Sequence, residues 1–151
     1  MGRESERFRR CVAAWQAHDL SGLTTAEKGD VALWRYALAG SFVVTDAEGK
    51  LMTLLQVAGA TKPRLFLVQL LERDACELFG RLPCLAELTL LPYHGRIVTT
   101  GEIRRVSSVV TAGGLELIER RFKLACSSPP VATARELIAH QRTTRGDANV
   151  F

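Results

Sequence analysis

The sequence lacks the short motifs by which many nucleotide-binding, hydrolytic and zinc enzymes are recognised. It contains no G-x-x-x-x-G-K-[ST] phosphate loop, no G-x-G-x-x-G after a strand, no H-E-x-x-H and no G-x-S-x-G. Its three histidines, His18, His94 and His140, are far apart, and none has a second ligand at metal-binding spacing. We therefore predict no metal site, no catalytic residues and no cofactor, and these absences weigh against an enzyme.

Paired cysteines and long apolar runs are also absent. The longest nearly apolar runs, such as LFLVQLL, are far shorter than the roughly 20 residues of a membrane helix, and MGRESERFRR has no apolar signal segment. We therefore predict a cytoplasmic protein with no membrane contact. The four cysteines form no C-x-x-C pair and have apolar neighbours, which predicts small buried thiols in a reducing compartment. They are Cys11, Cys76, Cys84 and Cys126.

What the chain does have is the composition of one ordinary globular domain. It has 151 residues, of which 47% are hydrophobic and 24% charged, and a chain of this length buries roughly 68–70% of its unfolded surface. No linker, repeat or low-complexity segment divides it. We expect a single domain over residues 1–142, followed by a frayed tail over residues 143–151 that has little to bury.

Two helices are expected near the N-terminus. Apolar side chains recur at helical spacing between Ser5 and His18, which predicts an amphipathic helix. Thr24 and Glu27 have the spacing of a capping box and predict the start of a second helix. Because Gly29 weakens that helix, a start at Asp30 is the alternative. We expect Gly40 to end it in a left-handed conformation.

The middle of the chain has the alternation and turn residues of a sheet. A hairpin is expected around the loop 46–49, with Gly49 at positive φ, and a short helix is expected to connect two of the later strands. We expect Pro92 to end its strand, because proline cannot donate to a sheet ladder. The expected strands are 41–45, 50–57, 65–69, 86–91, 96–99 and 102–110.

Two further helices are expected after the sheet. Residues 115–125 have apolar side chains at helical spacing, although a seventh strand is the alternative, and Thr133 with Glu136 forms a second capping box. Helices and strands do not alternate strictly, which argues against a doubly wound parallel fold. The sequence thus predicts a single α+β domain. It would have about six strands in an antiparallel or mixed sheet, N-terminal helices, one short connecting helix and C-terminal helices.

The stretch LTLLPYHGRIVTTGEI resembles a segment of bacterial and archaeal proteins of unknown function. Those proteins have a strand-turn-strand pattern LLPF-x-G-x-I-x-x-D-G. Tyr93 takes the aromatic position, and the other matching residues are Leu90, Leu91, Pro92, Gly95, Ile97 and Gly101. The likeness extends over about residues 65–125. Thr100 stands where those sequences usually have an acidic residue, so any role of that carboxylate would be missing. The resemblance supports the expected fold and implies no reaction.

Tyr93 and His94 are candidate binding residues because they lie in a turn that contains proline and glycine. Loop side chains are often free to face a ligand, although a plain turn explains the same residues. An enzyme would need Tyr93 and His94 to converge with Glu87 or Glu102 in one pocket, with at least one perturbed pKa. Nothing in the spacing predicts that convergence.

Four arginines are further candidates, for contact with phosphate groups. Residues 96–151 hold nine basic and five acidic side chains and account for the whole net charge of +4. Arginine is a bidentate phosphate ligand, but neighbouring strand residues face opposite sides, and surface aromatics for stacking on bases are lacking. The alternative is an ordinary solvated surface. The four are Arg104, Arg105, Arg120 and Arg121.

Three functions remain open to the sequence. The leading hypothesis is a non-enzymatic protein-binding or assembly module, because amphipathic helices at both ends could dock a protein partner or a second copy. The first alternative is nucleic-acid binding through the basic C-terminal third. The second is a small enzyme with a site around Tyr93 and His94.

Overall fold

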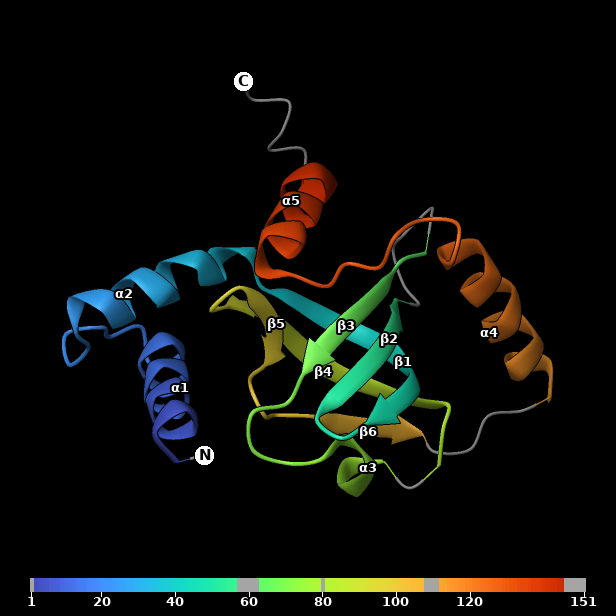
Figure 1. The fold of residues 1–151 in the computed structure, drawn as a ribbon, viewed down its shortest axis with the longest axis horizontal. Helices are drawn as coiled ribbons and strands as arrows, with labels where there is room; N and C mark the ends of the chain where they lie inside the picture. The colour runs from blue at the N-terminus through green and yellow to red at the C-terminus, as the bar shows by residue number, and fades with distance from the viewer. Residues whose placement is uncertain (1, 57–62, 80, 108–111, 146–151) are drawn as a thin grey trace.

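The computed structural model describes residues 2–56, 63–79, 81–107 and 112–145. They form an α+β structure with helices before and after one sheet (Figure 1). In chain order the elements are α1 (Gly2–Gln16), α2 (Thr25–Ala32), the 3₁₀ turn η1 (Leu33–Tyr36), β1 (Leu38–Glu48), β2 (Leu51–Gln56), β3 (Leu65–Gln69), α3 (Ala75–Leu78), β4 (Cys84–Tyr93), β5 (Arg96–Thr99), β6 (Arg104–Ser107), α4 (Ala112–Ala125) and α5 (Ala134–Arg145).

The sheet closes into a barrel, because β1 pairs with β2 on one edge and with β4 on the other. The neighbours around the barrel are β1, β2, β3, β5 and β4, and the pairing of β3 with β5, at Gln69 and Val98, is parallel. β6 pairs with Leu85–Glu87 and β5 with Leu90–Tyr93, so these two strands follow one another along the same edge of β4. The α+β class is confirmed, but the barrel has five strand positions rather than six.

The order of these strands is that of a Greek-key barrel. β4 crosses the barrel to pair with β1, and β5 returns to lie beside β3. A five-stranded Greek-key barrel is the architecture of the OB-fold, which hosts many unrelated functions. The architecture therefore does not assign a function to this protein.

The barrel interior is the main hydrophobic core. In the first part of β4 the residues with buried side chains alternate with half-buried ones, which is the period of two expected of a strand with one face on a core. The short helix α3 contributes Ala75 to this core. The core includes Phe42, Val44, Met52, Leu54, Phe66, Val68, Cys84, Ala86, Leu88, Leu90 and Ile97.

The N-terminal helices cover the outer surface of β4 and β5. Phe8, Cys11 and Val12 on α1 pack with Trp34 of η1 against Tyr93, and together they form a second core outside the barrel. This second core explains why every residue of β4 after Thr89 is buried.

The capping box at the start of α2 is confirmed. The backbone N–H of Glu27 donates to Thr24 Oγ1 at 3.1 Å, and the N–H of Thr24 donates to Glu27 Oε1 at 2.9 Å. Gly29 lies inside the helix, so the alternative start at Asp30 is wrong. The helix begins where two side-chain oxygens satisfy N–H groups that would otherwise have no partner.

Gly40 does not end a helix. The helical segment ends at Tyr36, and Ala37 is already extended, with ψ 145°. Gly40 instead pairs with Leu88 inside the β1–β4 ladder and has no positive φ. The long-range pairing of β1 with β4 overrides the local preference of a glycine for a helix end.

Pro92 does not end β4 either, because the strand continues through Tyr93. Tyr93 and Arg96 flank the turn as a hydrogen-bonded pair, so the next pair, Pro92 and Ile97, exchanges no backbone hydrogen bonds. On the other edge of β4 the pairing with β1 stops at Leu90. The missing N–H of proline therefore breaks no ladder hydrogen bond at this position.

The C-terminal helices lie on different sides of the barrel (Figure 1). Residues 112–125 form a helix, which excludes the alternative of a seventh strand. α4 packs Ile118, Phe122 and Ala125 against β1, β2 and β3. α5 runs to Arg145, three residues into the segment expected to be a frayed tail, and residues 146–151 lie outside the described residues.

Two further findings concern the surface. Cys11 and Cys84 are buried as expected, but Cys76 and Cys126 are exposed, so the prediction of buried thiols is wrong for those two. Among the helices in the described ranges, none combines the length and the apolar character that crossing a membrane requires.

Candidate functional site

The turn between β4 and β5 consists of His94 and Gly95, with φ of 48° and 81°. Positive φ at both central residues is typical of a type I′ hairpin turn, whose twist matches that of the flanking strands. Glycine adopts this conformation readily, and histidine is one of the few other residues that do so with some frequency. The turn predicted from Pro92 to Gly95 is therefore a tight two-residue hairpin.

Tyr93 points into the protein rather than toward a ligand. Its side chain is 1% exposed and lies between Phe8, at a centroid distance of 5.0 Å, and Trp34, at 6.2 Å. Burial, and then the negative charge of Asp30, raises the pKa of Tyr93 above its ordinary value of 10.0. Its hydroxyl has no hydrogen-bond partner in the described part of the chain. Tyr93 therefore belongs to the second core, which lies outside the barrel under the N-terminal helices.

His94 is more accessible than Tyr93 but is held in place. Its ring stacks on Tyr93 with a centroid distance of 3.9 Å and an interplanar angle of 14°. Its Nε2 lies 3.0 Å from Asp30 Oδ2 on α2, and Arg7 Nη2 reaches the same oxygen at 3.5 Å. His94 therefore joins the β4–β5 turn to the N-terminal helices.

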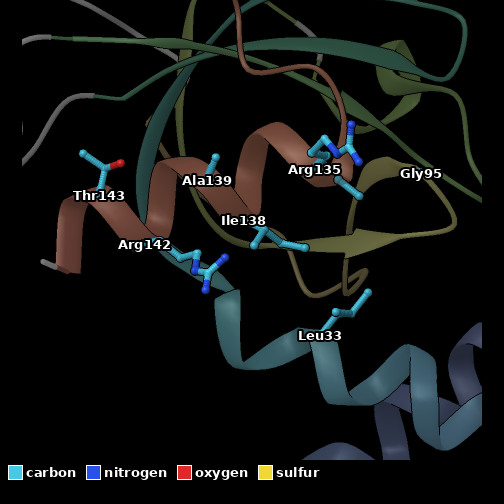
Figure 2. A pocket seen from close by; sticks show the side chains of 8 residues that line it. Leu33, Gly95, Arg135, Ile138, Ala139, Arg142 and Thr143 are labelled. Carbon is cyan, nitrogen blue, oxygen red and sulfur yellow. The ribbon is translucent and has the colours of Figure 1, made fainter. Parts of the chain in front are cut away.

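A groove opens on the other side of this turn. It lies between η1, the turn and one face of α5, and encloses about 930 Å³. Figure 2 shows the side chains of Leu33 and Ile138 in it, with Arg135 and Arg142 on the same helix as Ile138. Among the described residues, no acidic side chain lines it. The groove thus has an apolar floor and two cationic side chains, and its volume lies within the roughly 300–1,000 Å³ range of ligand pockets.

Hydrogen bonds fix both ends of this groove. The N–H of Ala134 donates to the carbonyl oxygen of Gly95 at 3.2 Å, which fixes the start of α5 to the turn. At the other end, Gln141 Nε2 donates to the carbonyl oxygen of Ala37 at 2.8 Å, next to η1. Arg145 Nη2 donates to that same oxygen at 3.1 Å. The groove is therefore preformed by contacts that are distant in the sequence.

The sequence reasoning did not find the residues of the groove. Arg135, Ile138 and Arg142 have the i, i+3, i+7 spacing of one helix face. That pattern was a signal, but it also fits an ordinary surface helix. What completes the groove is the approach of Leu33 and Gly95 from elements far away in the chain.

The four predicted arginines come from two separate elements. Arg104 on β6 is 77% exposed and lies 3.9 Å from Glu87 on β4. Arg105 pairs with Ala86 in the ladder. On α4, Arg120 is exposed and Arg121 is half-buried. Figure 1 shows α4 apart from β6, so the two pairs of arginines do not form one patch.

The acidic residues considered for a catalytic site do not gather at the turn. Glu87 lies on the same strand as Tyr93 but six residues earlier, which corresponds to about 20 Å along a strand. The N–H of Glu102, beyond β5, donates to Thr100 Oγ1 at 3.4 Å. The described residues also contain no group of three or more His, Cys, Asp or Glu side chains that could hold a metal ion.

Comparisons with known proteins identify no protein similar to this chain. No protein-family model, curated protein or solved structure matches the chain. The resemblance of residues 65–125 to proteins with the LLPF-x-G-x-I motif therefore stays a prediction, and the function must be argued from the geometry.

Proposed function

We propose that this protein is a non-enzymatic assembly module that pairs with a second copy of itself through α4. The observation that carries the proposal is the exposure of two leucines on this helix. Leu117 is 52% exposed and Leu124 is 58% exposed. Seven residues separate them, so they lie two turns apart on the same side of the helix.

The exposed leucines are not part of the face by which α4 is attached to the barrel. Ile118, Phe122 and Ala125 form that face, and Leu117 and Leu124 lie beside it. Fully burying a leucine is worth roughly 1.5–3 kcal/mol relative to leaving it exposed. Both leucines are about half exposed, and a symmetric dimer covers four of them, two from each copy. The interface therefore gains a substantial part of this burial free energy for each of the four leucines.

The charges on α4 favour an antiparallel pairing. Glu116 and Lys123 are also seven residues apart, and each is next to one of the exposed leucines. A two-fold axis across an antiparallel helix pair places Glu116 beside Lys123 of the partner subunit, and the converse pair follows by symmetry. In a parallel pairing the two copies of Glu116 would lie on opposite sides of the interface, and neither would meet Lys123 of the partner subunit. The helix is thus complementary to itself in one orientation.

The surface of the barrel offers less support for nucleic-acid binding. OB-folds bind oligonucleotides across the second and third strands. Here β2 and β3 contain no basic residue, and their one aromatic residue, Phe66, is buried in the barrel. The outward residues next to this face are Asp46 and Glu48, which pair with Thr53 and Leu51. A face without stacking side chains or cations is poorly suited to a single strand.

We place this assembly in the cytosol. No disulfide joins the cysteines of the described residues, and the thiols of Cys76 and Cys126 are exposed. Free surface thiols persist most readily in a reducing compartment.

Light scattering coupled to size-exclusion chromatography tests the proposal. The wild-type protein should run as a dimer, and Leu117→Ser with Leu124→Ser should run as a folded monomer. Leu51→Ser is the matched control, because Leu51 is 57% exposed on β2 and lies outside α4. A monomeric wild-type protein, or a dimer that survives the double substitution, would refute assembly through α4.

Charge exchange tests the orientation. Glu116→Lys alone or Lys123→Glu alone should weaken the dimer because like charges meet, whereas the two together should restore it. The same runs with a random oligonucleotide at low and high salt test the alternative. A complex that forms at low salt and dissociates at high salt would favour nucleic-acid binding instead.

A further inference from the structure

We propose that the groove between η1, the β4–β5 turn and α5 binds a small amphipathic anion, with a carboxylate, sulfonate or phosphate head and an apolar body. This inference does not depend on assembly through α4, because the two surfaces share no residue. It rests on the shape of the groove, the chemistry of its lining and the way its walls are fixed.

Arg135 is the residue that would receive the anionic head. It lies in the first turn of α5 and is exposed at the groove. It makes no ion pair or hydrogen bond with any described residue. An anion at this end would therefore meet a guanidinium group that has no partner among the described residues.

The nearest carboxylate on α5 does not compete for Arg135. Glu136 is engaged in the capping box, where its Oε1 accepts hydrogen bonds from the N–H groups of Ala132 at 3.2 Å and Thr133 at 3.0 Å. Thr133 Oγ1 also donates to this oxygen at 3.0 Å. These hydrogen bonds lower the pKa of Glu136 and keep its charge at the helix start.

The rest of the groove suits the apolar body. Ile138 lies one turn after Arg135 on α5, and Leu33 faces the groove from η1 while remaining 42% exposed (Figure 2). Ala134 and Ala139 are small, which leaves open space along the helix. Arg142 lines the groove two turns beyond Arg135. A ligand lying along α5 would cover the apolar side chains that water now contacts.

The segments that form the walls of the groove need little rearrangement when a ligand binds. The Ala134–Gly95 and Gln141–Ala37 hydrogen bonds hold α5 at a fixed distance from the turn and from η1. A preformed site loses less conformational entropy on binding than a flexible one. The fixed walls also determine where a blocking side chain must be placed.

The probes are 1-anilinonaphthalene-8-sulfonate, which fluoresces when its ring system is in apolar surroundings, and dodecanoate, which should displace it. Dodecyltrimethylammonium has the same apolar chain with the opposite charge, so it should displace the fluorophore much less well. If both amphiphiles displace it equally, the groove has no preference for anions and the proposal is wrong.

Two substitutions locate the binding. Arg135→Gln should weaken dodecanoate binding roughly tenfold, as expected for the loss of a charged hydrogen bond. Ala139→Trp should abolish binding by filling the groove from an exposed helical position. The matched controls are Arg104→Gln on β6 and Ala26→Trp on α2, which change an exposed arginine and an exposed alanine outside the groove.

Circular dichroism and thermal melting should show that all four variants are folded. Dodecanoate binding that is unchanged in Ala139→Trp would overturn the proposal, because the ligand would then lie elsewhere. The α4 variant Leu117→Ser with Leu124→Ser should bind dodecanoate like the wild type. Loss of binding in that variant would place the ligand on α4 and would also overturn the proposal that it binds in the groove.

Discussion

The indole Nε1–H of Trp34 donates a hydrogen bond of 2.9 Å to the carbonyl oxygen of Pro92. The two residues are 58 positions apart in the chain, and the bond is buried. It satisfies a strand carbonyl near the end of the β1–β4 ladder and attaches η1 to the barrel. This contact holds the N-terminal helices, and with them one wall of the groove, against β4.

Trp34→Phe should therefore destabilise the protein by about 2–4 kcal/mol. The smaller ring loses packing, and the buried carbonyl of Pro92 loses its partner. Urea denaturation measures the change. Trp15→Phe is the control, because Trp15 packs against Trp34 at a centroid distance of 5.5 Å but makes no hydrogen bond in the described chain. Equal losses in the two variants would show that the hydrogen bond contributes nothing.

Tyr93→Phe should leave the stability unchanged or raise it by up to about 1 kcal/mol. The hydroxyl of Tyr93 is buried without a hydrogen-bond partner in the described residues, so it is desolvated with no compensation. Tyr36→Phe is the comparison, because Tyr36 accepts a hydrogen bond of 3.0 Å from Arg35 Nη2. That variant should lose about 0.5–1.5 kcal/mol. A clear loss of stability in Tyr93→Phe would reveal a partner for its hydroxyl.

Glu27→Gln should destabilise the protein at neutral pH and have little effect in acid. The N–H of Thr24, and then the guanidinium of Arg10, lower the pKa of Glu27 below its ordinary value of 4.5. The ionised carboxylate therefore stabilises the folded state above about pH 4.5, and this contribution is lost as the pH falls through the lower folded-state pKa.

Melting temperatures of the wild type and of Glu27→Gln should be measured from pH 7 to pH 3. The two curves should be separated at neutral pH and should converge in acid. Glu6→Gln is the control, because Glu6 is exposed on α1 and has no ion pair with the described residues. Curves for Glu27→Gln that stay parallel to the wild type at every pH would contradict the assignment of the stabilisation to the charge.

His140 should make the protein less stable as the pH falls below about 6.5. Burial, and then the positive charge of Arg64, lower the pKa of His140 from its ordinary value of 6.5. Its ring lies edge-on to Phe66 at a centroid distance of 5.3 Å. The unfolded chain therefore takes up the proton first, and stability is lost between 6.5 and the lower folded-state pKa.

In His140→Gln this part of the pH dependence should disappear. His18→Gln is the control, because His18 is exposed and has positive φ at the end of α1. Thermal melts between pH 8 and pH 5 would measure the difference. A wild-type protein with the same slope as His140→Gln over this range would contradict the prediction.

Several parts of the structure could be predicted because their causes are local. The capping boxes at Thr24 and Thr133 were predicted correctly, because their hydrogen bonds join residues only three positions apart. The positive φ of Gly49 and the whole of β3 were also predicted correctly. The hairpin loop was not, because β1 continues through Glu48 and the loop is residues 49–50 rather than 46–49. For each correct prediction a few neighbouring residues contain all the information.

The candidate site could not be predicted to the same extent. His94 was placed correctly in a turn, but Tyr93 is the last residue of β4, and the sequence does not say that Phe8 and Trp34 cover one side of that turn. It also does not say that Gly95, the next residue, faces α5. Those positions follow from the packing of helices at both ends of the chain against the same two strands.

The sequence by itself determined the local elements, because periodicity, capping and turn preferences act over a few residues. Only the tertiary structure decided that β1 pairs with β4 to close a barrel, that Gly40 and Pro92 lie within strands, and that Leu33 faces Ile138 across a groove. These relationships depend on the burial of apolar surface between segments far apart in the chain. No short stretch of sequence specifies which distant segment completes its core.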